Sequence, residues 1–296
     1  MLAQTRIALI TCTDAWEIDD DAPLLVQALA DQQILAEPAI WDSPEIDWSS
    51  YTAAVLRSPW DYTERPSEFL AALEQIQLST KVLNPLAVLR WNIDKHYLAD
   101  LAKAGLPVVP TEFLSDLTSF EEQVFPIEGR FVVKPTISSG SRNTAQYGQS
   151  DRAEARAHLE QLLEAGYQVM VQPYIDSVED VGETGMVFFL DEFSHGFRKG
   201  ALLTEGIAPV AGLYAPEAIT PRVPSPAQLE LAHRALQITR ERCGTDSLLY
   251  ARVDVLEGSD GQPQLLELEL TEPSYFLRTD AASPARAAAA YARALA

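Results

Sequence analysis

The sequence has few cysteines, few basic residues and no long apolar run. Its two cysteines, Cys12 and Cys243, lie far apart and belong to no metal-binding motif, so we expect reduced thiols in a cytoplasmic protein. No stretch approaches the roughly 20 apolar residues of a membrane span. The first residues lead directly into a strand-like run, and we therefore expect neither a signal peptide nor a membrane partner.

Basic residues number 22 against 43 acidic ones, which gives a net charge of −21. A chain of this charge is a poor partner for nucleic acid, whose phosphates attract lysine and arginine. An anionic ligand such as a nucleotide would need a local cluster of basic side chains or a metal ion. The length of 296 residues predicts two or three subdomains rather than one core.

Strand-like and helical patterns alternate along the first part of the chain. Ile7–Thr11, Ile34–Trp41 and Ala53–Ser58 read as strands, Pro66–Ile76 reads as a helix, and Val82–Leu83 as a further short strand. This alternation predicts a parallel α/β domain. We expect this domain to cover residues 1–91 and two further subdomains to cover residues 92–170 and 171–296.

Arg57, Trp60, Asp61 and Tyr62 lie at or just after the end of the third predicted strand. In open α/β sheets, ligands bind outside the carboxyl ends of the strands, so these four residues are candidates for a substrate pocket. The alternative is ordinary packing of Trp60 and Tyr62 beside a surface pair between Arg57 and Asp61.

Two other polar features have structural interpretations. Asp19, Asp20 and Asp21 precede a helical apolar pattern, and acidic residues at that position cap a helix and favour its dipole. His195 lies near the end of a predicted strand, where we expect it to form hydrogen bonds.

The last two apolar runs, Leu248–Leu256 and Gln264–Leu270, each carry charged residues at every second position. Side chains alternate faces along a strand, so Arg252 and Asp254 share one face. A hairpin that turns on Asp260-Gly261 places Asp254 opposite Glu267 and Arg252 opposite Glu269.

Asp254 and Glu267 would then have Cβ atoms roughly 5 Å apart. Two carboxylates at that distance repel by about 3 kcal/mol at an effective dielectric near 20. A divalent cation such as Mg²⁺ would relieve this repulsion, because it prefers oxygen ligands. The alternative is an exposed hairpin whose acids extend into water, and a slip of one residue in the register would remove the pairing.

Phe131–Pro135 is an apolar strand that contains Lys134, and it is followed by small residues around Gly140. A partly desolvated lysine needs an anion, and backbone N–H groups of small residues can approach a phosphate closely. Neither the P-loop nor the dinucleotide fingerprint is present. The irregular stretch Gly206–Pro226 is a candidate lid.

Together these features resemble the ATP-grasp superfamily, nearest to the cycloserine-forming cyclo-ligases that act on O-ureido-serine, and next to glutathione-synthetase-like ligases. The resemblance rests on Lys134, the small-residue loop 138–143, the strand end Gln172–Ile175, and the Arg252/Asp254 and Glu267/Glu269 pairs. It implies a two-lobed α/β ATP-grasp fold after an N-terminal parallel domain. Residues 92–170 would be the central ATP-grasp subdomain and residues 171–296 the C-terminal one.

The resemblance also implies roles for individual residues. Lys95, at the start of a predicted helix Asn92–Ala104, and Lys134 would hold the nucleotide phosphates. Glu183 would reach the ribose, and Arg252 the transferring phosphate. Further implied residues are the loop residues Ser139, Gly140 and Arg142, the adenine contacts Gln172, Tyr174 and Ile175, the catalytic cations Arg198 and Lys199, and the ligands of two Mg²⁺ ions (or Mn²⁺), Asp254, Glu267 and Glu269.

We therefore expect an ATP-dependent ligase that phosphorylates a carboxylate-like group of a small amino-acid-like substrate, which an amine then attacks. One alternative is ATP-driven ring closure of a ureido amino acid, and another is a non-catalytic ATP- or metal-binding module. A protein kinase is disfavoured, since no catalytic-loop or Asp-Phe-Gly motif occurs. The sequence leaves the oligomeric state open, a homodimer included.

Overall fold

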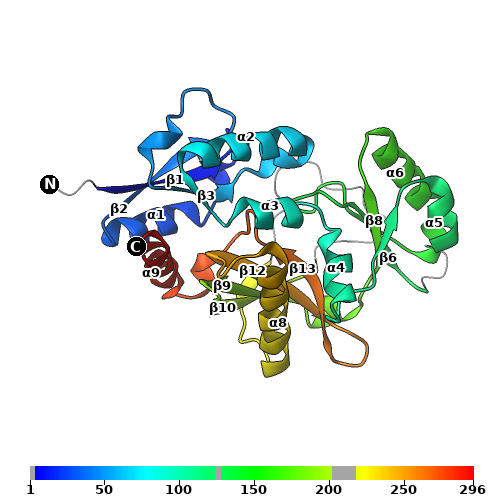
Figure 1. The fold of residues 1–296 in the computed structure, drawn as a ribbon. Helices are drawn as coiled ribbons and strands as arrows, with labels where there is room; N and C mark the ends of the chain where they lie inside the picture. The colour runs from blue at the N-terminus through cyan, green and yellow to red at the C-terminus, as the bar shows by residue number, and fades with distance from the viewer. Residues whose placement is uncertain (1–3, 124–127, 202–217) are drawn as a thin grey trace.

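The computed structural model describes residues 4–123, 128–201 and 218–296. Three β-sheets follow one another through the molecule, and helices cover their outer faces (Figure 1). None of the helices in these ranges has the length and apolar character that a membrane span requires.

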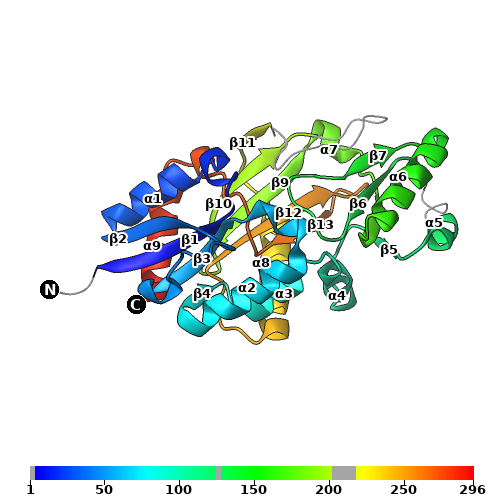
Figure 2. The same cartoon turned by 90° about the horizontal axis from the view of Figure 1, so that it is seen from above.

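The N-terminal sheet is parallel, as the sequence predicts, with the strand order β2-β1-β3-β4. Ile7 and Leu9 face one side, with helix α1, while Ala8 and Ile10 face the other, with helix α2. Figure 2 shows the sheet between these helices. The elements are β1 Thr5–Thr11, α1 Ala22–Asp31, β2 Ile34–Ile40, β3 Ala53–Ser58, α2 Pro66–Ser79 and β4 Lys81–Leu83.

The central sheet is antiparallel, with the order β5-β8-β6-β7. Phe131 and Val133 of β6 pack against the helix α6, and the alternation of the strand turns Lys134 to the opposite face. The boundary expected between residues 170 and 171 lies inside β8. The elements are β5 Glu112–Leu114, α5 Leu117–Gln123, β6 Phe131–Pro135, β7 Ala145–Tyr147, α6 Arg152–Glu164 and β8 Val169–Pro173.

The third sheet has the order β11-β10-β9-β12-β13. Helix α8 packs with Ala251, Val253 and Val255 of β12, so the intervening residues Arg252 and Asp254 point to the opposite face. The elements are α7 Ser177–Asp180, β9 Glu183–Phe189, β10 Glu192–Lys199, β11 Ile219–Pro221, α8 Pro226–Cys243, β12 Tyr250–Glu257 and β13 Pro263–Glu269.

The predicted register of the β12–β13 hairpin is confirmed where it carries the charges. Arg252 pairs with Glu269, and Asp254 pairs with Glu267. Nearer the turn the register shifts by one residue: Val255 pairs with Leu265 instead of Leu266. This bulge leaves the polar pairs on one face and re-aligns only the end of the hairpin.

One helical segment differs from the sequence prediction. The predicted helix Asn92–Ala104 is in fact the end of α3, Leu86–Asn92, followed by α4, Tyr97–Lys103, and Lys95 lies in the turn between them. The terminal helix α9, Ser283–Leu295, packs beside α1 in the core of the N-terminal domain. The chain therefore returns to its first domain after completing the third sheet.

Candidate functional site

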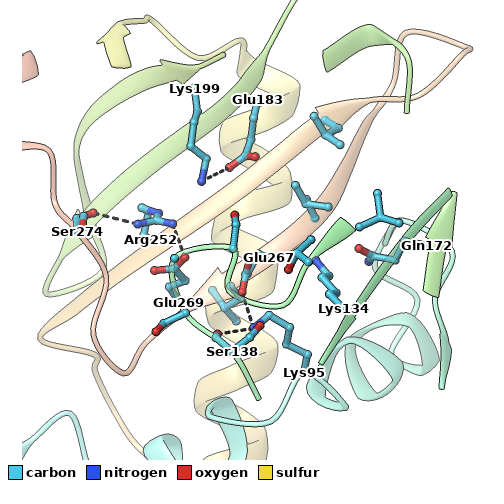
Figure 3. Close-up of a pocket in the computed structure, with 18 of the residues that line it drawn as sticks. Lys95, Lys134, Ser138, Gln172, Glu183, Lys199, Arg252, Glu267, Glu269 and Ser274 are labelled. Carbon is cyan, nitrogen blue, oxygen red and sulfur yellow. Dashed lines mark hydrogen bonds and ion pairs between the residues drawn. The ribbon is translucent and has the colours of Figure 1, made fainter. Parts of the chain in front are cut away.

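A cavity of about 210 Å³ lies where the three sheets meet. The N-terminal domain contributes Trp60 and Tyr62, the central sheet contributes Lys134 and Gln172, and the third sheet contributes Arg252 and two glutamates of β13. Figure 3 shows Gln172 and Lys134 on one side of this pocket and Arg252 and Ser274 on the other. The predicted site residues on its wall are Trp60, Tyr62, Lys95, Lys134, Ser139, Gly140, Gln172, Tyr174, Ile175, Glu183, Lys199, Arg252, Glu267 and Glu269.

Lys95 and Lys134 approach the pocket from different elements. Lys95 is buried, and its Nζ lies 3.0 Å from Glu267 Oε1 and donates to the carbonyl oxygen of Ser138 at 2.9 Å. In the described ranges, no carboxylate lies within ion-pair distance of the Lys134 ammonium. Burial lowers the pKa of Lys134, and attraction to Glu267 only partly offsets this effect. Lys134 is thus a partly desolvated cation on the pocket wall, where an anion could bind it.

The hairpin acids are held by arginine and lysine. The guanidinium of Arg252 donates to both carboxylate oxygens of Asp254 at 2.8–3.0 Å and also contacts Glu269. Across the neighbouring strand, Lys199 Nζ lies 3.1 Å from Glu183 Oε1 and 3.9 Å from Asp254 Oδ2. These pairs place acidic and basic groups alternately along one wall.

The two glutamates of β13 differ in their electrostatic environment. Burial would raise the pKa of Glu267, but attraction to Lys95 and Lys134 outweighs burial and brings the pKa below its ordinary value. The pKa of Glu269 is raised, first by burial and then by the neighbouring carboxylates, although Arg252 opposes this change. A surplus of negative charge therefore surrounds Glu269, and an added cation would relieve it.

Asp254, Glu267 and Glu269 offer only oxygen donors, which suits Mg²⁺. In the part of the chain that the structure describes, no three acidic, histidine or cysteine side chains converge closely enough to hold a metal by themselves. The carboxylates fit Mg²⁺ as partial ligands that would share the ion with nucleotide phosphates, once lysine and arginine turn toward those phosphates. Their role as ligands remains a prediction.

Gln172 lies near the end of the strand β8, and Tyr174 and Ile175 follow it, all three on the pocket wall. Gln172 is buried and donates to Thr111 Oγ1 at 2.9 Å, and the guanidinium carbon of Arg130 lies 4.4 Å from the centre of the Tyr174 ring. The small-residue loop turns tightly, with positive φ at Gly140 and Ser141. These positions suit an aromatic base and its phosphates.

Five predicted residues are absent from the pocket wall. One is the predicted metal ligand Asp254, which is buried and pairs with Arg252. Arg57 is fully buried and forms an ion pair with Asp19 at 2.7 Å, instead of pairing with Asp61 or lining the pocket. Asp61 accepts from Trp41 Nε1 at 2.8 Å and pairs with Arg65. Arg57 and Asp61 therefore neither line the pocket nor pair with each other, so both predictions for these two residues are wrong. The alternation of the strand turns Arg57 into the core.

Arg142 and Arg198 also point elsewhere. Arg142 pairs with Glu64 in the N-terminal domain, while Arg198 donates to the carbonyl oxygens of Val181 and Asp180. The neighbouring residue Lys199 faces the pocket. In the predicted lid, residues 206–217 lie outside the described residues.

The aspartates before α1 also differ from the expectation. No side chain caps α1 at its N-cap residue, Asp21. Asp21 instead binds the backbone of residues 275–277, and Asp19 binds Arg57. His195 is buried and donates through Nε2 to the carbonyl oxygen of Tyr275 at 2.7 Å, which confirms its hydrogen-bonding role.

Glu272 and Ser274 line the pocket, and sequence reasoning assigned them no role. Burial raises the pKa of Glu272 to about 7, partly opposed by a hydrogen bond with Tyr62 and by Lys95. In the sequence, only its position just after the predicted hairpin indicates that Glu272 could lie at the site. Asn92 and Tyr97 also lie at the pocket, where they bind the backbone of β13.

Comparisons with known proteins agree with this geometry. Residues 7–84 match the family model described as D-cycloserine synthetase DcsG, N-terminal domain. The chain is 38% identical over 276 residues to the cycloserine biosynthesis protein DcsG of Streptomyces lavendulae, covering 90% of this chain and 91% of that protein.

Solved structures show the same architecture. The crystal structure of D-cycloserine synthetase DcsG matches with a TM-score of 0.92 and 36% identity, covering 98% of this chain and 100% of that one. The ATP-grasp ligase PsnB, complexed with a minimal precursor, matches with a TM-score of 0.63 and 19% identity, covering 98% and 99%. The second likeness shows the ATP-grasp fold.

Proposed function

The chain belongs to the D-cycloserine synthetase family of ATP-dependent ATP-grasp ligases, and we propose that it closes a ring within O-ureido-serine or a closely similar ureido amino acid. The observation that carries this proposal is that part of the pocket wall comes from the N-terminal domain. Trp60 and Tyr62, which line the pocket, lie within residues 7–84, the stretch that resembles the N-terminal domain of D-cycloserine synthetase.

Most of the predicted pocket residues would bind the nucleotide and its metal ions. Gln172, Tyr174 and Ile175 would contact adenine, and Glu183 would reach the ribose by exchanging its contact with Lys199. Lys95 and Lys134 would bind the phosphates through charge-assisted contacts. Asp254, Glu267 and Glu269 would hold Mg²⁺, which when bound neutralises phosphate charge.

The reaction we propose has two steps. A substrate carboxylate oxygen attacks the γ-phosphorus of ATP and ADP leaves, while Arg252 stabilises the charge on the transferring group. A nitrogen of the same molecule then attacks the acyl carbon and loses its proton, and phosphate leaves with the former carboxylate oxygen. Burial of the site limits hydrolysis of the acyl phosphate.

The test is to supply ATP, Mg²⁺ and O-ureido-serine labelled with ¹⁸O in its carboxylate. We expect ADP, a cyclic product without any added amine, and ¹⁸O in the released phosphate. AMP and pyrophosphate would mean an adenylate intermediate and would contradict the mechanism. Product formation only with an added amine would instead support intermolecular ligation.

A further inference from the structure

We propose that Glu272 binds the α-ammonium group of the amino-acid substrate, with Tyr62 orienting its carboxylate. This inference rests on the proposed function only in requiring a substrate that carries an amino group. It assigns a ligand contact to a residue that the nucleotide and metal chemistry leave unused.

The charge pairing in the pocket sets Glu272 apart. Four glutamates line the wall, and three of them are paired with cations: Glu183 with Lys199, Glu267 with Lys95, and Glu269 with Arg252. Within the described residues, no lysine or arginine lies within ion-pair distance of Glu272. A carboxylate at a ligand pocket that lacks its own cation is complementary to a cationic ligand group.

The backbone on both sides of Glu272 is held firmly. The carbonyl oxygen of Thr271 accepts from the Tyr250 hydroxyl at 2.9 Å, and the carbonyl oxygen of Ser274 accepts from Arg252 Nη1 at 3.2 Å. Directly after this segment, the N–H of Tyr275 donates to Asp21 at 2.6 Å. Glu272 is thus presented from a fixed segment, as a recognition residue requires.

Tyr62 is the neighbour that we infer orients the Glu272 side chain, since both residues line the pocket. Its hydroxyl interacts electrostatically with Glu272, and its buried ring stacks on Phe69 with centroids 5.0 Å apart. Trp60 adds an aromatic surface to the pocket wall, and aromatic faces attract cations. The raised pKa of Glu272 agrees with this arrangement, since a bound ammonium would stabilise the charged carboxylate.

The position of Glu272 suits an amino acid. Ser274 and Arg252 lie on the side of the pocket away from Gln172 (Figure 3), and Glu272 is two residues before Ser274. The guanidinium of Arg252 can receive the reacting carboxylate, while Glu272 receives the ammonium group of the same molecule. This pairing selects amino acids over simple carboxylic acids.

The experiment compares Glu272→Gln with the wild type on two substrates, O-ureido-serine and the same molecule without its α-amino group. Loss of one charge-assisted contact should lower kcat/KM for the amino acid about 10- to 100-fold, mainly through KM. The desamino substrate should react about equally with both proteins. Tyr62→Phe should give a smaller change in the same direction, and it serves as the second variant if Glu272→Gln fails to fold.

An equal loss with both substrates would overturn the proposal. A higher Mg²⁺ requirement, or weaker binding of MgATP by calorimetry, would also overturn it, because Glu272 would then belong to the metal site. The proposed function is judged separately, by cyclic product from the wild type. If the wild type instead releases ADP with another amino acid, that amino acid and its desamino analogue replace the pair above.

Discussion

Asp21 and Tyr275 are 254 residues apart, yet the carboxylate Oδ2 of Asp21 accepts the backbone N–H of Tyr275 at 2.6 Å. The same carboxylate also accepts the N–H groups of Phe276 and Leu277, at 3.0 and 2.7 Å. One side chain of the N-terminal domain therefore binds the segment that follows the hairpin. That segment carries Glu272 and Ser274 into the pocket.

Asp21→Asn should loosen this segment, because an amide has one acceptor oxygen for three N–H groups. We expect a loss of about 2 kcal/mol in the free energy of unfolding, typical of hydrogen bonds to a charged group. The KM for the amino-acid substrate should rise while ATP affinity stays unchanged. The neighbouring Asp20→Asn is the matched control: Asp20 is exposed, and its substitution should change stability by no more than about 0.5 kcal/mol.

Arg57→Met should destabilise the fold rather than alter substrate contacts directly. Arg57 is buried against Asp19 and lies over the Tyr275 ring, 4.3 Å from its centroid. Removing one partner of a buried ion pair typically costs about 3–5 kcal/mol. Arg65→Met breaks exposed pairs with Asp42 and Asp61 and should cost about 1 kcal/mol or less. Equal Tm values for the two variants would contradict the structural role of Arg57.

Lys134→Met should weaken ATP binding at least about tenfold by calorimetry, since it removes a charge-assisted phosphate contact. The same change should raise the Tm of the ligand-free protein. Burial lowers the pKa of Lys134, which means that keeping its charge destabilises the folded state at neutral pH. Lys103→Met, at the exposed end of α4, should leave both values unchanged.

Glu267→Gln should reduce ATP turnover at least about 100-fold at saturating Mg²⁺, if metal stabilisation of the transferring phosphate is lost. It is a cleaner test than Asp254→Asn, because Asp254 is the buried partner of Arg252. Glu257→Gln changes the same hairpin beyond the pocket and should remain active. Normal turnover in Glu267→Gln would exclude Glu267 as a necessary metal ligand.

His195 should make stability depend on pH. Burial lowers the pKa of His195 below its ordinary value of 6.5, although the hydrogen bond to Tyr275 opposes this change. Below pH 6.5 the unfolded chain gains a proton that the folded protein resists, so stability should fall by up to about 1.4 kcal/mol for each pH unit.

The check is Tm measured from pH 7 to pH 5. His195→Gln retains a donor for the Tyr275 carbonyl but cannot titrate, and its Tm should depend less on pH than that of the wild type. His233→Gln, on the exposed face of α8, should keep the wild-type dependence. An identical slope for His195→Gln and the wild type would rule out this contribution.

Local sequence patterns determined most elements and one decisive register. The apolar run Ala53–Ser58 predicted β3 at its observed bounds, and Pro66–Ile76 predicted all but the last three residues of α2. The Asp260-Gly261 turn and the alternating charges predicted the opposition of Asp254 and Glu267. These features depend on neighbours close in the chain, for which period and turn chemistry are sufficient.

The tertiary structure alone decided which charged residues meet. Arg57 and Arg198 looked like pocket cations, but strand alternation and long-range partners turned them into the core or onto backbone carbonyls. Lys95 was predicted in a helix but lies in a turn, where Ser138 and Glu267 bind it. The hydrogen bond between Asp21 and the backbone of Tyr275 is likewise evident only from the tertiary structure. Partners separated by hundreds of residues are selected by how the sheets pack, and no local pattern encodes that packing.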